Sequence, residues 1–174
     1  MRRKAYFAGG CFWCIEPVFE AIPGVVSAVS GYSGGQEADP SYEDVKAQRT
    51  GHRETVCVEY EDDAVSYEAL LEAYLDSVDP FDGGGQFIDR GRSYTLAVYY
   101  TCAEEQNAAE KRLRELEASA GHPAAVSLEP FQGFYMAEEV HQDYYRKNPE
   151  AFRRELEESG RAARAEALKE KKGN

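Results

Sequence analysis

Alternating apolar residues predict five short β-strands in this chain. The clearest period of two places Val56, Val58 and Tyr60 on one face of a strand and Cys57 on the other. Further strands are predicted over residues 4–8, 25–32, 94–101 and 126–128. We expect the run 94–101 to be a central strand, because it is rich in aromatic and β-branched side chains.

Apolar residues at helical spacing predict the elements between these strands. Helices are expected over residues 15–21, 67–78, 102–119 and 137–148. Asp79-Pro80 ends the second of them, and Pro149 follows the fourth. The third begins with Thr101-Cys102-Ala103-Glu104, a capping-box pattern that places Cys102 in the first turn.

The order of these elements is strand, helix, two strands, helix and strand. It predicts an α+β fold, a two-layer sandwich with a mixed sheet and a ferredoxin-like βαββαβ core. The run from Phe81 to Ser93 holds four glycines and shows no period. Loops of this length are often functional, so we expect it to form one wall of a site.

The length of the chain limits the number of domains it can form, and its charge limits the classes of partner it can bind. Its 174 residues fit one folded domain, which we expect over residues 1–149, followed by a charged tail over residues 150–174 that forms a solvated helix with a frayed end. The net charge of −12 argues against binding to nucleic acid or to anionic membranes. A small molecule or a protein is the expected partner.

Four scattered cysteines are too few for a disulfide scaffold, and they lack the spacing of a zinc site. Reduced thiols in a cytoplasm fit this pattern best. The first residues contain no apolar run of signal-peptide length, and no segment approaches the length of a membrane span. We therefore expect a cytoplasmic protein.

The most informative segment is Gly9-Gly10-Cys11-Phe12-Trp13-Cys14, where a strand meets a helix. Pro17 is tolerated in a first turn, so this helix is expected to begin near Trp13 or Cys14, with Cys11 just ahead of it. Helix N–H groups would then favour the thiolate and lower the pKa of Cys11. We expect Cys11 to be a nucleophile rather than a buried cysteine in a tight turn.

A thiolate beside Phe12 and Trp13 suits a substrate with a methyl group on sulfur, because such groups make favourable contacts with aromatic rings. Attack on an oxidised sulfur also needs a proton donor. Glu54 lies just before a strand and could project into a cleft, although the sequence alone favours a carboxylate that faces solvent. The other candidates, in or beside loops with glycine or proline, are Tyr42, Tyr94 and Asp89.

Six motifs follow one another between Tyr6 and about Asn148. They are Gly10-Cys11-Phe12-Trp13 with Glu16, Gly31-Tyr32-Ser33-Gly34-Gly35, Pro40-Ser41-Tyr42-Glu43-Asp44-Val45, Thr50-Gly51-His52-Arg53-Glu54, Gln86-Phe87-Ile88-Asp89-Arg90-Gly91 with Tyr94, and Ala137-Glu138-Glu139-Val140-His141-Gln142. In this order they resemble the A-type peptide methionine sulfoxide reductases. One such motif is weakly specific, whereas the collinear set is strongly specific.

The resemblance implies reduction of the S epimer of methionine sulfoxide, free or in proteins, to methionine. It further implies recycling by thioredoxin or a similar dithiol, with no metal and no organic cofactor. We expect the chain to act as a monomer that repairs oxidised proteins.

The resemblance also assigns roles to individual residues. Cys11 matches the nucleophile that becomes a sulfenic acid, and Glu54 matches the carboxyl group that gives a proton to the sulfoxide oxygen. Tyr42 and Tyr94 match tyrosines that hydrogen-bond this oxygen. The residues expected to line the substrate site are Phe12, Trp13 and Asp89.

The identity of the resolving thiol stays open at the level of the sequence. Cys14 is ranked first because a Cys-x-x-Cys pair at a helix start can close a disulfide, although many relatives have glycine there. Direct reduction by an external thiol comes second, and Cys57 or Cys102 come last. The histidines His52 and His141 are interpreted as positioning groups rather than as catalysts.

Two other functions remain to be weighed against sulfoxide reduction. A thioredoxin-like dithiol–disulfide oxidoreductase would use Cys11 and Cys14 but would not need Glu54. A module that binds methionine without turnover would not need Cys11 either.

Overall fold

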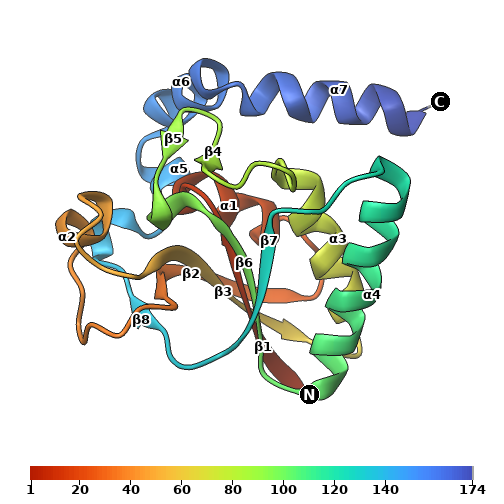
Figure 1. Cartoon of the computed structure of the whole chain (residues 1–174). Coiled ribbons are helices and arrows are strands. Elements are labelled where there is room, and N and C mark those ends of the chain that lie inside the picture. The colour runs from red at the N-terminus through yellow and green to blue at the C-terminus, as the bar shows by residue number, and fades with distance from the viewer. Residues whose placement is uncertain (174) are drawn as a thin grey trace.

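A six-stranded mixed sheet forms the centre of the computed structural model, which describes residues 1–173 and side chains as far as Ala167 (Figure 1). Across the sheet the strands are β7 (Val126–Pro130), β6 (Leu96–Tyr100), β1 (Arg2–Gly9), β3 (Arg53–Glu61), β2 (Val25–Ser33) and β8 (Tyr135–Met136). No helix among the described residues has both the length and the apolar character that crossing a membrane requires.

The four inner strands confirm the ferredoxin-like core. They lie in the order β6-β1-β3-β2, with every neighbouring pair antiparallel. β7 then pairs with β6 in parallel, which makes the sheet mixed as predicted. The long helix α4 (Ala103–Ala120) connects these two parallel strands.

Three helices cover one face of the sheet. They are α1 (Phe12–Glu20), α3 (Tyr67–Ser77) and α4. The prediction that Val56, Val58 and Tyr60 share one face of β3 is confirmed, since all three lie in the large core beneath these helices. Cys57 points to the opposite face, into a smaller cluster that Phe131 and Phe134 cover.

Local side-chain bonds change several of the predicted elements. The expected helix over residues 137–148 is wrong. The segment contains the 3-10 turn η2 (Glu139–His141) and the short helix α5 (Tyr144–Lys147). Between them, Gln142 bonds the N–H and C=O of Ser30, and Asp143 has a positive φ of 53°. These bonds to a distant strand replace the i to i+4 ladder of a helix.

The predicted structureless loop over residues 81–93 is also wrong in detail. It folds as a small hairpin of β4 (Gly85–Gln86) and β5 (Asp89–Arg90), followed by the 3-10 turn η1 (Arg92–Tyr94). The side-chain amide of Gln86 fixes the base of this hairpin. It accepts a hydrogen bond from the Asp79 N–H and donates one to the Asp79 C=O. A short helix, α2 (Tyr42–Lys46), was not predicted.

Two smaller expectations at the third predicted helix need correction. Cys102 is the N-cap of α4 and lies outside its first turn, so its side chain does not belong to the helix. The capping interaction joins Thr101 to Glu105, not to Glu104, because the Glu105 carboxylate accepts from both the backbone and the hydroxyl of Thr101.

The C-terminal segment forms α6 (Pro149–Ser159) and α7 (Arg161–Gly173), which cross the end of the molecule beside α1 and the β4–β5 hairpin (Figure 1). The tail is helical as expected, but its start is not solvated. Phe152 and Leu156 pack beside Cys11 and Cys14, and Arg161 is buried. The segment therefore covers the region that holds the candidate nucleophile.

Candidate active site

Cys11 lies where β1 ends and α1 begins. It lies just ahead of α1, as the sequence predicts, and it is the N-cap residue because the helix starts at Phe12, one residue before the nearer of the two expected starts. The preceding Gly10 has a φ of +87°, and a Cβ there would lie 2.6 Å from Arg161 Nη2 and 2.8 Å from Gln86 Cβ. Only glycine fits this turn. The turn delivers Cys11 to a site in which its side chain is 5% exposed.

Glu54 projects from β3 into the same site and is buried, not solvent-facing. Its Oε1 accepts the backbone N–H of Phe12 over 3.1 Å, while Oε2 is buried with no partner among the described residues. Burial raises the pKa of Glu54 to about 8, with the charge of Asp89 adding to the effect and the Phe12 bond opposing it. At neutral pH Glu54 therefore holds a proton that it can donate.

Arg53 fixes the start of β3 and so the position of Glu54. Its buried guanidinium donates to Thr95 Oγ1, Tyr99 Oη and Glu129 Oε2 over 2.8, 3.0 and 2.7 Å. The neighbouring His52 accepts the Gly35 N–H and contacts the Glu37 carbonyl over 2.8 Å, as expected of a loop-positioning residue.

Tyr42, Tyr94 and Asp89 border Cys11 and Glu54. Burial raises the pKa of both phenols, and the charges of Glu54, Cys11 and Asp89 raise them further. Both tyrosines thus stay protonated and can donate hydrogen bonds. Burial also raises the pKa of Asp89, whose Oδ2 has no partner among the described residues. The three residues come from α2, η1 and the β4–β5 hairpin.

Aromatic rings form the other side of the site. Trp13 stacks on Tyr144 with ring centroids 4.0 Å apart, and its Nε1 donates to His141 Nδ1 over 3.1 Å. Phe12 turns toward the core but still contacts the rings of Tyr42 and His141. The acceptor role of Nδ1 assigns the proton of neutral His141 to Nε2. His141 therefore orients the tryptophan, in agreement with its interpretation as a positioning group.

Glu16 anchors the segment that supplies His141 and Tyr144. Its buried carboxylate accepts the Ser30 hydroxyl over 2.9 Å and the Asp143 N–H over 3.0 Å. Burial raises the pKa of Glu16 to about 7. Together with the Gln142 amide, it ties this segment to β2. The sequence indicated this role only through the place of Glu16 in the first motif.

The four cysteines lie in three different places. Cys14 shares a buried cluster with Cys11 and Tyr94, whereas Cys57 lies on the opposite face of the sheet, where Tyr6 is its hydrogen-bond partner. Cys102 lies near Tyr60 and Tyr67, at the far end of β1. Of the three other thiols, only that of Cys14 lies in the same cluster as Cys11.

The expected low pKa of Cys11 is wrong for the protein without substrate. A hydrogen bond to Cys14 and complete burial raise the pKa of Cys11, and the charges of Cys14, Glu54 and Asp89 add to the effect. The same bond lowers the pKa of Cys14, and the charge of Arg161 helps. Of the two thiols, Cys14 is therefore the one that loses its proton more readily. The argument from the helix N-terminus missed this because it left out the second thiol and the carboxyl groups.

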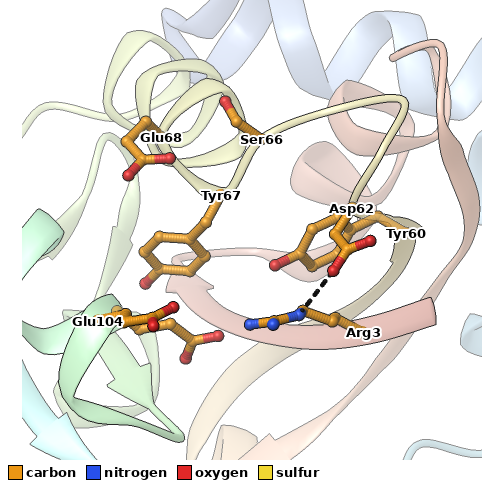
Figure 2. A pocket seen from close by; sticks show the side chains of 8 residues that line it. Arg3, Tyr60, Asp62, Ser66, Tyr67, Glu68 and Glu104 are labelled. Atoms are coloured by element: carbon orange, nitrogen blue, oxygen red, sulfur yellow. Dashed lines mark hydrogen bonds and ion pairs between the residues drawn. The ribbon is translucent and has the colours of Figure 1, made fainter. Parts of the chain in front are cut away.

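Two further features of the described residues do not form part of the site. A pocket of about 210 Å³, shown in Figure 2, lies at the far end of β1, where Arg3 is bonded to Asp62 beside Tyr60 and Tyr67. The carboxylates of Glu16, Glu20 and Asp143 lie within 4.8 Å of one another. Glu16 and Glu20 already accept bonds from protein donors, so this cluster does not indicate a metal centre.

The sequence of this chain is similar to those of one known protein family. Residues 3–172 match the family model described as peptide methionine sulfoxide reductase. A curated protein of Halalkalibacterium halodurans, named peptide methionine sulfoxide reductase MsrA, is 44% identical over 160 residues and 91% of each chain. The match to the family model extends through most of the C-terminal segment.

Solved structures show the same fold. Reduced Mxr1 from Saccharomyces cerevisiae superposes with a TM-score of 0.81 and 27% identity, over 86% of this chain and 87% of that one. Mxr1 in complex with Trx2 matches with a TM-score of 0.56 and 19% identity, over 82% and 84% of the two chains.

Proposed function

This chain belongs to the peptide methionine sulfoxide reductase family and reduces methionine sulfoxide to methionine, and we propose that Cys11 and Glu54 perform the chemistry. The observation that carries this assignment is the bond from Phe12 N–H to the buried Glu54 carboxyl, next to the Cys11 thiol. It brings a nucleophile and a protonated acid to one place.

In the proposed reaction, the Cys11 sulfur attacks the sulfoxide sulfur. Cys11 gives up its proton as its sulfur attacks, while Glu54 donates its own proton to the sulfoxide oxygen and takes up the proton that Cys11 released. The oxygen is transferred to Cys11 as a sulfenic acid, and methionine leaves. The phenols of Tyr42 and Tyr94 donate hydrogen bonds to the oxygen while its charge develops.

We assign the aromatic wall to recognition of the substrate. Trp13, held by His141 and Tyr144, together with Phe12 receives the methyl group on sulfur. We also assign Asp89 to the lining of the site, because its charge acts on both Glu54 and Tyr42. The motif resemblance extends the proposal to the S epimer, free or in proteins.

We propose that Cys14 resolves the sulfenic acid and that thioredoxin or a similar dithiol reduces the resulting disulfide. The common cluster of Cys11 and Cys14 supports the first part, since Cys57 and Cys102 lie elsewhere. The complex of yeast Mxr1 with Trx2 supports the second.

The oligomeric state, location and domain division are also proposals. Action as a monomer is a prediction. A cytoplasmic location and a division at residue 149 remain predictions. The contacts of Phe152 and Leu156 with the cluster of Cys11 and Cys14 argue that α6 completes the site rather than forming part of a separate tail.

An assay with the separate epimers of dabsyl-methionine sulfoxide and dithiothreitol tests the proposal. The S epimer should be reduced, and Cys11→Ser should abolish the activity. Cys14→Ser should lose thioredoxin-supported turnover while it keeps turnover with dithiothreitol. Reduction of the R epimer alone, or an active Cys11→Ser variant, would contradict the assignment.

A further inference from the structure

Arg161 brings a positive charge from the C-terminal segment into the interior beside Cys14. Arg161 is the first residue of α7 and is 6% exposed. Nη2 donates to the Gly9 carbonyl over 3.1 Å, Nη1 donates to the Ser77 carbonyl over 3.4 Å, and the guanidinium carbon lies 4.8 Å from the centre of the Phe87 ring. The guanidinium is thus held from three sides.

Among the described residues, no hydrogen bond or ion pair joins Arg161 to a carboxylate, although its charge acts to lower the pKa of the nearby Asp89 and Glu155. Both hydrogen bonds end on neutral carbonyls, and Nε is buried with no partner among the described residues. A buried charge is costly unless an opposite charge offsets it. Arg161 lines a cavity of about 100 Å³ together with Cys14, so the sulfur of Cys14 is available to fill this role.

Other charged groups around Cys14 act in both directions. The hydrogen bond from Cys11 and the charge of Arg161 lower the pKa of Cys14, while burial and the charges of Glu155 and Asp89 raise it. Glu54 also interacts with Cys14, and Asp76 and Arg164 line the cavity. Among the largest influences on the pKa of Cys14, Arg161 is the one cation.

We propose that Arg161 is a positioning residue for recycling, and that it holds the Cys14 sulfur as the thiolate that attacks oxidised Cys11. In this step the Cys14–Cys11 S–S bond forms and the S–O bond of the sulfenic acid breaks. The hydroxyl leaves as water with the proton that Cys14 gave up. Cys14 is oxidised and the sulfenic sulfur is reduced. The inference rests on the proposed role of Cys14 as the resolving thiol.

The test separates the two halves of the reaction. Reduced protein receives one equivalent of methionine sulfoxide, and methionine and the Cys11–Cys14 disulfide are both followed after quenching between about pH 6 and pH 9. For Arg161→Gln, the ratio of the disulfide rate to the methionine rate should fall about tenfold at neutral pH. The midpoint of its pH profile should rise by about one unit.

Two matched variants distinguish charge from packing. Arg161→Lys should restore the midpoint, because it keeps the charge. Arg164→Gln alters the same cavity and removes a bond to the Val78 carbonyl, but it should match the wild type. If Arg161→Gln does not fold, the midpoint of Arg161→Lys decides alone, since a role in packing predicts that lysine fails.

The possible failures are distinct. An unchanged rate ratio and midpoint in folded Arg161→Gln would overturn the role of Arg161, and so would a shifted midpoint in Arg161→Lys. Absence of any Cys11–Cys14 disulfide in the wild type would overturn the proposed role of Cys14 instead.

Discussion

The backbone N–H of Phe12 is bonded to Oε1 of Glu54 over 3.1 Å, which joins the first residue of α1 to the strand that carries the acid. Because Phe12 follows Cys11 directly, this bond fixes the distance between the nucleophile and the acid. The second oxygen, Oε2, is buried without a partner among the described residues. It is the oxygen from which a proton can be delivered to a substrate.

Glu54→Gln should lower the rate of sulfoxide reduction by about 10²-fold or more, because the amide keeps the bond to Phe12 but cannot donate an acidic proton. The rate is measured with the S epimer and dithiothreitol. Reduction of insulin disulfides serves as the comparison. If both activities fell together, a thioredoxin-like function would fit the chain better than acid catalysis by Glu54.

The same substitution should remove one contribution to the pH dependence of stability. The pKa of Glu54 rises from 4.5 to about 8 on folding, so its contribution is most favourable below the unfolded pKa and is lost as pH rises toward 8. Between pH 5 and pH 8 the wild type should lose about 3 kcal/mol relative to Glu54→Gln. Urea unfolding at both pH values measures the difference, and parallel curves would contradict it.

Trp13→Phe keeps a ring against Tyr144 but removes the bond to His141. We expect the KM for methionine sulfoxide to rise about three- to tenfold, equivalent to a hydrogen bond of about 1 kcal/mol, with little change in kcat. Steady-state kinetics decide this. A fall in kcat at constant KM would instead place Trp13 in the chemical step.

Gly10→Ala should destabilise the fold by about 3 kcal/mol, because the new methyl group meets Arg161 and Gln86 at a positive φ. Gly121→Ala is the matched control, since Gly121 also has a positive φ but nothing within 4 Å of the added carbon. It should cost about 1 kcal/mol from backbone strain alone. Equal losses in urea unfolding would remove the argument from close packing.

Cys57→Ser and Cys102→Ser should each retain thioredoxin-supported turnover within about twofold, because neither thiol lies in the cluster of Cys11. Turnover is followed through consumption of NADPH in the presence of thioredoxin reductase. Loss of turnover in either variant, with dithiothreitol-supported activity intact, would give that cysteine the resolving role.

The parts of the fold that could be predicted best were those marked by regular periodicity or by a local signal such as a proline. The alternation of Val56, Val58 and Tyr60 assigned the buried face of β3, and Pro17 placed the start of α1 within one residue. The broken helix around Gln142 could not be predicted in this way. Its side chain bonds a strand 112 residues away, and such long-range bonds leave no period in the sequence.

The electrostatics of the site were the least predictable part. The hydrogen bond to Cys14 and the burial of Cys11 itself reverse the direction expected for the pKa of Cys11, and both depend on tertiary packing. Arg161 was missed because it stands among the many charged residues of the C-terminal segment. Only the fold shows that it reaches the Gly9 carbonyl.

The bond from Arg161 to Gly9 spans 152 positions, which has a consequence for the protein during translation. A ribosome adds about 5–20 residues per second, so Cys11 leaves the exit tunnel roughly ten seconds before the helices that cover it. During this interval the nascent chain exposes its nucleophile without the guanidinium beside Cys14. The thiol that we propose as the nucleophile is therefore itself open to oxidants until α6 and α7 have left the ribosome.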